Sequence, residues 1–525
     1  MGKGDNRLMT RARPDFGQKA AGLFTHLDAA AGPGAVVAVL EHGKEIFSGT
    51  YGLANINNAV PMARDTILRI GSQTKQFTVL LTLMLEAEGK LSLSDRVQKY
   101  LPYVPTLEHE VTLLHLAQNT SGYRDHLEGM IFSGLSIYAP STRQTGRDVI
   151  ARQDALNFAP GSAMTYCNAG FFMLSEIIEQ IEGKSFNDVL TERITGPLGM
   201  KDTSLMRCDG AVIDRLAAHY TRRADGWYNL GWGLDLGGEG GMVSTLADMI
   251  IWQQNLWSPK VGTPEMYDRM STPCTYTNGV QGYYGLGLVT DTYRGRRAVG
   301  HGGTVAGGKS ESTRFIDDGL GVVIIANNDQ MATFSVGRRL ADIYFGDKPP
   351  APIAFNPGRY RHQDGSDIFE IVTADGVPAF HSGSVSPFDF AHPTGAKPER
   401  AITDLVLKPG AGDTIDGLFC GTARSYVPLA KDASASKPLA GRYVNETQSL
   451  KVEITGDSQT AKFHLRSGIG ALTTSLVAAD ADLWIMLPEG SELSPGQAWI
   501  GTLLVTEDGF TQNTDRMKNL SFTAL

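Results

Sequence analysis

Apolar residues along the chain follow two different periods, and the change between them separates a mixed region from two regions of short strands. From about residue 32 to residue 345 the pattern contains both strand and helix signals. Residues 35–52 hold two apolar segments joined at His42-Gly43, which predicts a β-hairpin. The almost wholly apolar start of residues 321–329 predicts a buried strand at the other end of this region.

Helices are predicted between these strands, where apolar residues recur at intervals of three and four. The predicted helices cover residues 72–89, a segment from Asn168 to Gly183, a segment capped by Ser185 that ends before Pro197, and residues 334–343. Strands at both ends with helices between them predict an α+β fold built on an antiparallel sheet.

After residue 345 the long helical periodicity disappears, and short alternating segments with Gly and Asp turns replace it. Pro-rich or Ala/Ser-rich linkers occupy residues 346–357 and 429–438. Each linker is followed by a similar opening, Pro357-Gly358-Arg359-Tyr360 and then Ala440-Gly441-Arg442-Tyr443, which predicts two duplicated antiparallel β-barrels. The predicted domains are residues 1–345, 346–434 and 435–525.

Composition agrees with this division and excludes several classes of function. The chain has 525 residues, enough for about three domains, with 42% hydrophobic and 20% charged residues. Its net charge is −9, and no stripe of Lys and Arg is present, so we expect no nucleic-acid partner. No apolar run approaches the roughly 20 residues that cross a bilayer, so we expect no membrane span.

The ends and the cysteines add three further expectations. Residues 1–15 are polar and lack an apolar secretory segment, so the chain is expected in the cytoplasm, with a periplasmic form whose leader has been removed as the alternative. The four cysteines are scattered, without a C-x-x-C pair, and no H-E-x-x-H is present. We therefore expect no metal site, no other cofactor and no dense disulfide framework.

The first candidate for chemistry is Ser72-Gln73-Thr74-Lys75, at the start of a predicted amphipathic helix. A serine hydroxyl becomes a good nucleophile when a neighbouring group accepts its proton. Residues i and i+3 share one face of a helix, so the Lys75 amine can reach the Ser72 oxygen. Burial would lower the lysine pKa enough for it to act as a base. The same spacing at Ser434 and Lys437 lies in a linker and predicts nothing.

Two further motifs can complete such a site. Tyr166-x-Asn168 supplies a phenol that can transfer protons and an amide that can bind Lys75 and a substrate carbonyl. His301-Gly302-Gly303-Thr304 supplies glycines that let a strand approach a ligand closely, and the Thr304 N–H can join that of Ser72 in an oxyanion hole. His301 can orient a carboxylate or assist proton transfer. The other Y-x-N matches, at Tyr276 and Tyr443, fit a turn and a strand start.

These three motifs occur in this order within residues 30–345, where the sequence resembles the penicillin-recognising serine hydrolases. That family includes class C β-lactamases, D,D-carboxypeptidases, related esterases and D-aminopeptidases. The resemblance implies a β-lactamase-like catalytic domain with Ser72, Lys75, Tyr166 and His301 as catalytic residues. It also implies that Asn168, Gly303 and Thr304 bind the substrate or the oxyanion. Supporting segments lie at residues 113–126, 196–203, 240–252 and 284–288.

The third motif distinguishes branches of this family. β-Lactamases of the group usually have Lys-Thr-Gly where this chain has His-Gly-Gly, which favours the D-aminopeptidase, D-amino-acid amidase and esterase branch. The three-part plan resembles D-aminopeptidase and the peptidase of linearised microcystin, and residues 491–505 resemble the last barrel of D-aminopeptidase. The resemblance implies a barrel loop that enters the active site, for which residues 466–472 are a candidate. Val289 stands where D-aminopeptidase has an asparagine associated with the substrate amine, which argues against strict recognition of a free D-amino-acid N-terminus.

The leading hypothesis is therefore a serine hydrolase that cleaves small peptides or amides containing D-residues through an acyl-enzyme on Ser72. Related enzymes make a homodimer the expected assembly. One alternative is an esterase with weak β-lactam hydrolysis. A second is a penicillin-binding-like sensor that is acylated without turnover. A triad hydrolase of another fold is disfavoured, because the chain contains no G-x-S-x-G elbow.

Overall fold

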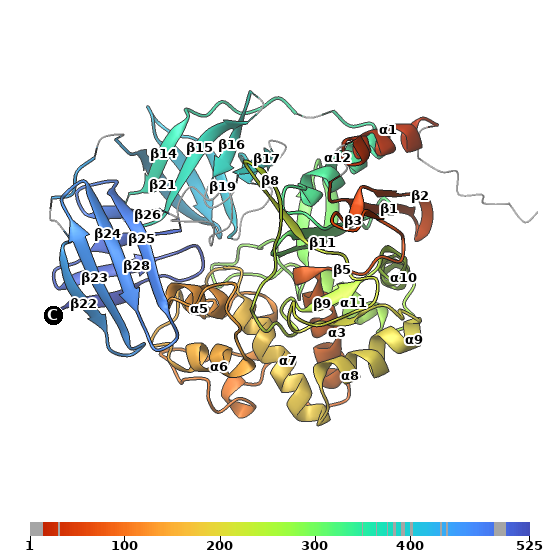
Figure 1. Cartoon of the computed structure of the whole chain (residues 1–525), viewed down its shortest axis with the longest axis horizontal. Coiled ribbons are helices and arrows are strands. Elements are labelled where there is room, and N and C mark those ends of the chain that lie inside the picture. Colours follow the sequence, from red (N-terminus) through yellow and green to blue (C-terminus); the bar gives the residue numbers. More distant parts are fainter. Residues whose placement is uncertain are drawn as a thin grey trace, which may run out of the picture.

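The computed structural model shows a mixed α/β region beside two all-β regions (Figure 1). It describes residues 14–29, 32–348, 350–363, 365–374, 376–381, 394–398, 403–430, 433–436, 439–487 and 500–525, and the backbone of residues 385–389. No helix in this described part of the chain is both long and apolar enough to span a lipid bilayer. The predicted α+β region with strand-rich C-terminal regions is confirmed.

A six-stranded antiparallel sheet forms the centre of the first region, in the order β10-β11-β12-β13-β1-β2. Its strands are β1 (Ala35–Glu41), β2 (Lys44–Tyr51), β10 (Val289–Tyr293), β11 (Arg296–Val305), β12 (Gly308–Phe315) and β13 (Leu320–Ala326). The predicted hairpin is confirmed, with His42 and Gly43 both at positive φ in the turn. β1 pairs with β13 so that Ala38 lies opposite Val323.

Both faces of this sheet are covered, which explains why β1 and β13 are apolar at consecutive positions. Val37 and Ile324 pack on one face with α1 (Phe16–Gly22) and α12 (Thr333–Phe345). Val36 and Ile325 pack on the other face with α10 (Leu246–Trp257) and most of the other helices. Short elements complete this region: α2 (Thr25–Ala29), β3 (Leu53–Asn55), β4 (Val60–Pro61), β5 (Leu68–Arg69), β6 (Ser204–Leu205), β7 (Tyr220–Arg223), β8 (Gly226–Asn229) and β9 (Met242–Ser244).

A helical layer covers the second face of the sheet and carries two of the site candidates, Lys75 on α3 and Asn168 on α7. Its helices are α3 (Thr74–Ala87), α4 (Leu113–Ala117), α5 (His126–Phe132), α6 (Arg143–Ala151), α7 (Asn168–Glu182), α8 (Phe186–Leu190), α9 (Gly196–Leu198) and α11 (Pro264–Ser271). The predicted signals at the ends of two helices are confirmed: α7 ends at Gly183 in the left-handed conformation, and Ser185 caps α8. α3 and α7 pack against each other, which brings their N-terminal ends together.

The second region is an eight-stranded antiparallel sheet whose two ends meet. Its strands run in the order β18-β17-β16-β15-β14-β21-β20-β19. A single bridge between Ala396 and Leu407 joins the segments at its two edges. The strands are β14 (Gly358–His362), β15 (Ile368–Ala374), β16 (Val377–His381), β17 (Val385–Asp389), β18 (Lys397–Pro398), β19 (Leu405–Pro409), β20 (Ile415–Phe419) and β21 (Thr422–Pro428).

The third region is a closed eight-stranded barrel in which consecutive strands pair and the last strand pairs with the first. Its strands are β22 (Gly441–Asn445), β23 (Leu450–Gly456), β24 (Thr460–Arg466), β25 (Ala471–Ala478), β26 (Leu483–Leu487), β27 (Gly501–Val505), β28 (Gly509–Asn513) and β29 (Leu520–Ala524). The repeated Gly-Arg-Tyr begins the first strand of each all-β region. In each, the tyrosine hydroxyl donates to a carbonyl four residues earlier: Tyr360 to Asn356 at 2.8 Å, and Tyr443 to Leu439 at 2.9 Å.

Candidate active site

The candidate nucleophile Ser72 lies in a short 3₁₀ turn, Gly71–Gln73, which leads directly into α3. Gly71 begins this turn at positive φ (55°), a conformation that glycine adopts without strain. The amide of Ser72 is in the first turn and has no acceptor within the helix, so its N–H is free to bind a developing negative charge. The turn therefore presents the serine hydroxyl and an unused amide together.

Lys75 is fully buried one turn after Ser72, and three oxygens surround its amine. Its Nζ lies 3.1 Å from Ser72 Oγ and 2.8 Å from Asn168 Oδ1, and it donates to the carbonyl oxygen of Glu239. An ammonium group can donate to all three oxygens. The neutral amine can donate to Asn168 and Glu239 and accept the Ser72 proton. The same arrangement therefore accommodates the lysine before and after proton transfer.

The pKa of Lys75 is about 7, well below its ordinary value. Burial is the largest cause, because a charged amine loses its hydration there. Glu239 and Asp125 raise the pKa, and Arg516 lowers it. A large fraction of Lys75 is consequently neutral near pH 7, as a base for Ser72 requires.

Tyr166 lies beside this pair, with the Lys75 amine 4.7 Å from the centre of its ring. Its hydroxyl is buried and makes no well-formed hydrogen bond to the residues that the structure describes. Burial raises the pKa of Tyr166 above its ordinary value, and the nearby Ser72 hydroxyl offsets only part of that rise. The phenol therefore keeps its proton at neutral pH and is suited to donate it.

Asn168 is the first residue of α7, and this position joins three elements. Its side-chain oxygen accepts from Lys75, and its backbone N–H donates to Asp125 Oδ2. The other oxygen of Asp125 caps α5 by accepting from Leu127 N at 3.0 Å and Glu128 N at 3.1 Å. One buried carboxylate thus fixes α5 relative to the N-terminus of α7, and α7 in turn orients the amide that holds Lys75.

His301 on β11 is buried and contacts two aromatic residues. Its Nδ1 donates to the Gly302 carbonyl, so Nε2 of the neutral ring accepts from the Tyr284 hydroxyl at 3.0 Å. The His301 ring lies 5.9 Å from the centre of the Tyr166 ring. The structure therefore places His301 next to Tyr166 and fixes its orientation through Tyr284.

Gly303 and Thr304 bring β11 against the turn that carries Ser72. A side chain at Gly303 has no room, because a Cβ atom there would lie 1.9 Å from the Ile70 carbonyl oxygen. A Cβ atom on Gly71 would lie 3.0 Å from the Thr304 nitrogen, so this amide is adjacent to the nucleophile turn. The two glycines permit an approach that places the Thr304 and Ser72 amides on neighbouring segments.

This constellation lies inside a region that a known family matches. The Beta-lactamase family matches residues 20–344. The chain belongs to the Beta-lactamase family. The match includes Ser72, Lys75, Tyr166, Asn168 and the segment from His301 to Thr304, and it ends in the last turn of α12.

Several curated relatives, each named D-aminopeptidase, resemble the chain over a similar length. The D-aminopeptidase of Cereibacter sphaeroides is 31% identical over 315 residues, which cover 59% of this chain and 60% of that protein. The D-aminopeptidase of Brucella anthropi is 30% identical over 318 residues, covering 60% of each chain. The chain thus spans about 60% of the length of the relatives it matches.

Two solved structures are similar to the chain in fold. The octameric penicillin-binding protein homologue of Pyrococcus abyssi, 19% identical, superimposes with a TM-score of 0.57 and covers 90% of this chain and 98% of that one. The D-amino acid amidase of Ochrobactrum anthropi SV3, 24% identical, gives a TM-score of 0.52 and covers 63% of this chain and 98% of that one. These similarities concern the fold.

The final barrel reaches this Beta-lactamase region through two loops. The predicted loop, residues 466–472, contacts the end of α5: Ser467 Oγ donates to the Ser133 carbonyl, and Gly470 packs against Gly134. The loop between β28 and β29 lies against the catalytic residues, with the Arg516 guanidinium 5.3 Å from the centre of the Tyr166 ring. Residues 491–499 of the segment that resembles D-aminopeptidase lie outside the described residues.

Four residues of the site were not singled out from the sequence: Asp125, Glu239, Tyr284 and Arg516. Asp125 and Tyr284 lie in segments that the family resemblance had marked, residues 113–126 and 284–288. Glu239 holds Lys75 through its backbone carbonyl, which any residue could supply, although its side chain also raises the Lys75 pKa. Within the described residues, no group of three or more His, Cys, Asp or Glu side chains could hold a metal ion.

Proposed function

We propose that this protein is a serine hydrolase that cleaves amide bonds of small peptides containing D-amino acids through an acyl-enzyme on Ser72. The observation that carries this proposal is the buried Lys75 amine, with a pKa of about 7, held between Ser72, Asn168 and the Glu239 carbonyl. The D-aminopeptidase relatives support D-residues in the substrate. The predicted D-peptide class extends to longer linear peptides, such as linearised microcystin.

In the first half-reaction Ser72 Oγ attacks the carbonyl carbon, and its proton passes to Lys75 Nζ. The Ser72 and Thr304 amides bind the oxygen that becomes negative. Tyr166 gives its proton to the leaving nitrogen as the C–N bond breaks, and Lys75 returns a proton to Tyr166. Water then attacks the ester and gives one proton to Lys75, which returns it to Ser72 Oγ as the acid leaves.

Replacement of Ser72 tests this assignment directly. Ser72→Ala should abolish turnover of D-residue dipeptides, D-alanine amide and linearised microcystin, measured by mass-spectrometric product analysis on a mixed library of D- and L-peptides. The family's own chemistry predicts a loss of at least about 10⁴-fold, as for other serine nucleophiles. Retained activity in Ser72→Ala would disprove the proposal.

The same measurements separate the alternatives. Turnover of nitrophenyl esters and nitrocefin without turnover of D-peptides would favour the esterase. Stable, stoichiometric labelling of Ser72 by a fluorescent penicillin, without turnover of any substrate, would favour the sensor. A homodimer remains the expected assembly, and sedimentation velocity of the full chain measures it.

A further inference from the structure

The loop between β28 and β29, residues 514–519, belongs to the final barrel and places a positively charged side chain beside the catalytic tyrosine. Arg516 is the residue of this loop that faces the site, with its guanidinium 5.3 Å from the centre of the Tyr166 ring. The positive charge of Arg516 acts on both Lys75 and Tyr166 and lowers the pKa of each. A residue 350 positions from Tyr166 in the sequence is therefore part of the same electrostatic environment.

The backbone of this loop, and not the Arg516 side chain, is fixed to the catalytic region. Glu128 Oε2 on α5 accepts from Arg516 N at 3.1 Å and from the Thr514 hydroxyl. The Arg516 carbonyl accepts from Asn157 Nδ2 at 2.9 Å and from Asp125 N at 3.3 Å. Four backbone and side-chain contacts thus set where the guanidinium lies without engaging its N–H groups.

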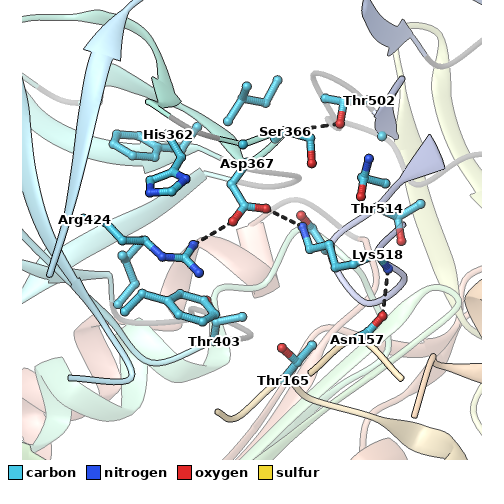
Figure 2. Close-up of a pocket in the computed structure, with 18 of the residues that line it drawn as sticks. Asn157, Thr165, His362, Ser366, Asp367, Thr403, Arg424, Thr502, Thr514 and Lys518 are labelled. Atoms are coloured by element: carbon cyan, nitrogen blue, oxygen red, sulfur yellow. Dashed lines mark hydrogen bonds and ion pairs between the residues drawn. The ribbon is translucent and has the colours of Figure 1, made fainter. Parts of the chain in front are cut away.

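A second anchor lies on the other side of the loop, in a cavity of about 390 Å³ where all three regions meet (Figure 2). Lys518 Nζ pairs with Asp367 of the second region at 2.7 Å, and Lys518 N donates to Asn157 Oδ1 at 2.8 Å. Figure 2 shows Asp367 between Lys518 and Arg424, with Asn157 below them. The loop is consequently held on both sides of Arg516.

The Arg516 guanidinium itself has unused donors. Its Nε lies 3.6 Å from Glu128 Oε1, an ion pair too long for a hydrogen bond. No side-chain nitrogen of Arg516 makes a hydrogen bond to the residues that the structure describes, and its side chain is 26% exposed. A guanidinium presents five N–H donors in a plane that matches a carboxylate. Its position beside a catalytic tyrosine, with donors unpaired and partly accessible, is typical of a ligand-binding arginine.

We propose, on the basis of the proposed function, that Arg516 binds a carboxylate of the substrate on the leaving-group side of the scissile bond. Tyr166 delivers its proton to the leaving nitrogen, so a group that lies over the Tyr166 ring faces that half of the substrate. The preferred substrates are then D-residue peptides whose leaving portion ends in a free carboxylate. The competing role for Arg516 is to neutralise Asp125, Glu128 and Asp515, which surround it.

Matched pairs of substrates test the assignment on the full chain. Each D-residue dipeptide is supplied as the free acid and as the C-terminal carboxamide, and kcat/KM for peptide-bond cleavage is measured for both. The wild type should prefer the acid by at least about tenfold, as a charge-assisted hydrogen bond predicts. Arg516→Gln should lose this preference, with kcat/KM for the acid falling at least about fivefold more than kcat/KM for the carboxamide, whose own change follows from the altered pKa of Lys75.

Two further variants serve as controls. Arg516→Lys keeps the charge without the planar donors and should keep part of the preference. Arg442→Gln removes the same charge from an exposed position on β22 of the same barrel and should behave as the wild type. An equal loss for acid and carboxamide in Arg516→Gln would assign Arg516 to charge neutralisation and overturn the proposal, as would equal kcat/KM for the pair in the wild type.

Binding to Ser72→Ala separates this proposal from the proposed function. Calorimetry with the same acids and carboxamides should show tighter binding of the acid, and the preference should disappear in Ser72→Ala/Arg516→Gln. Arg516-dependent binding without cleavage by the wild type would support the carboxylate site and contradict the hydrolase. Cleavage without any acid preference in either measurement would support the hydrolase and contradict the carboxylate site.

Discussion

Lys75 shows how burial changes the chemistry of one side chain. An exposed lysine is almost wholly protonated at neutral pH and cannot accept the proton of a serine. Here the amine is removed from water but keeps three oxygen partners, so the cost of losing its charge is small. The nearby anions Asp125 and Glu239 keep the pKa from falling further. Burial and these partners together hold the pKa of Lys75 near neutral pH.

The pH profile should report this lysine. Because its pKa is lowered to about 7, Lys75 is protonated below pH 7 and neutral above it. We expect kcat/KM for a D-dipeptide carboxamide to fall about tenfold per pH unit below 7 and to level off above it. Since Arg516 lowers this pKa, Arg516→Gln should move the profile to higher pH, and Arg442→Gln should leave it in place. A profile that rises only near pH 10 would contradict the role of Lys75 as the base.

At the scale of elements, the site depends on two close approaches between segments far apart in sequence. β11 lies against the turn before α3, and Asp125 joins the N-terminal ends of α5 and α7. Buried and more exposed residues alternate over most of residues 296–305, as in a strand with two different faces. The segment pairs with β12, where Gly303 lies opposite Ser310. Ser310 Oγ also donates to the Ile70 carbonyl at 2.7 Å, so both strands contact the residue that precedes the turn.

A methyl group at Gly303 should separate β11 from the nucleophile turn. A Cβ atom there would overlap the Ile70 carbonyl oxygen, so Gly303→Ala must move β11 or the turn by more than 1 Å. We expect a loss of about 2–4 kcal/mol in the free energy of unfolding and at least about 100-fold in kcat. Gly468→Ala, where nothing lies within 4 Å of the added atom, is the matched control in a denaturant titration. Wild-type kcat in a folded Gly303→Ala would rule out this close contact.

At the scale of the whole molecule, each region has an apolar core, and both apolar and polar contacts join the regions: Phe132 of α5 packs in the barrel core, and Ile368 of the second region packs against Leu483 of the barrel. The first region holds its core on both faces of the six-stranded sheet, and separate apolar clusters fill the second sheet and the closed barrel. The predicted boundaries near residues 345 and 434 remain a prediction. Asp367 is one of several charged residues that pair across regions: it pairs with Arg424 of its own sheet and with Lys518 of the barrel, both at 2.7 Å.

Loss of the Asp367 charge should lower the free energy of unfolding, because Asp367 pairs with Lys518 of the barrel. Burial raises the pKa of Asp367, but Lys518 and Arg424 lower it by more, so its folded pKa lies below that of the unfolded chain. Its contribution to stability is therefore complete at pH 7 and is lost as the pH falls below about 4. Asp367→Asn should cost about 1–3 kcal/mol at pH 7, as measured by thermal unfolding, and less in acid.

Glu453→Gln removes a charge from the exposed pair of Glu453 with Arg442 in the same barrel and should cost less than about 0.5 kcal/mol. A cost for Asp367→Asn that is independent of pH would indicate a packing effect in place of the ion pairs.

The sequence by itself determined the local structure and the main catalytic candidates. Three- and four-residue periodicity predicts α7, an apolar run predicts β13, and the spacing of Ser72 and Lys75 places them on one helical face. These features depend on neighbours within a turn or two of the chain, and short-range geometry is encoded in short patterns. The repeated Gly-Arg-Tyr likewise predicted two all-β regions.

Only the tertiary structure decided which distant groups complete the site. The Glu239 carbonyl is a backbone atom that any residue could supply, and Arg516 is one of 47 Lys and Arg residues with no local feature to distinguish it. Their roles arise because the packing of α3, α7 and the final barrel brings them to Lys75 and Tyr166. Burial sets the pKa of Lys75 in the same way, since exclusion of water is a property of the assembled fold.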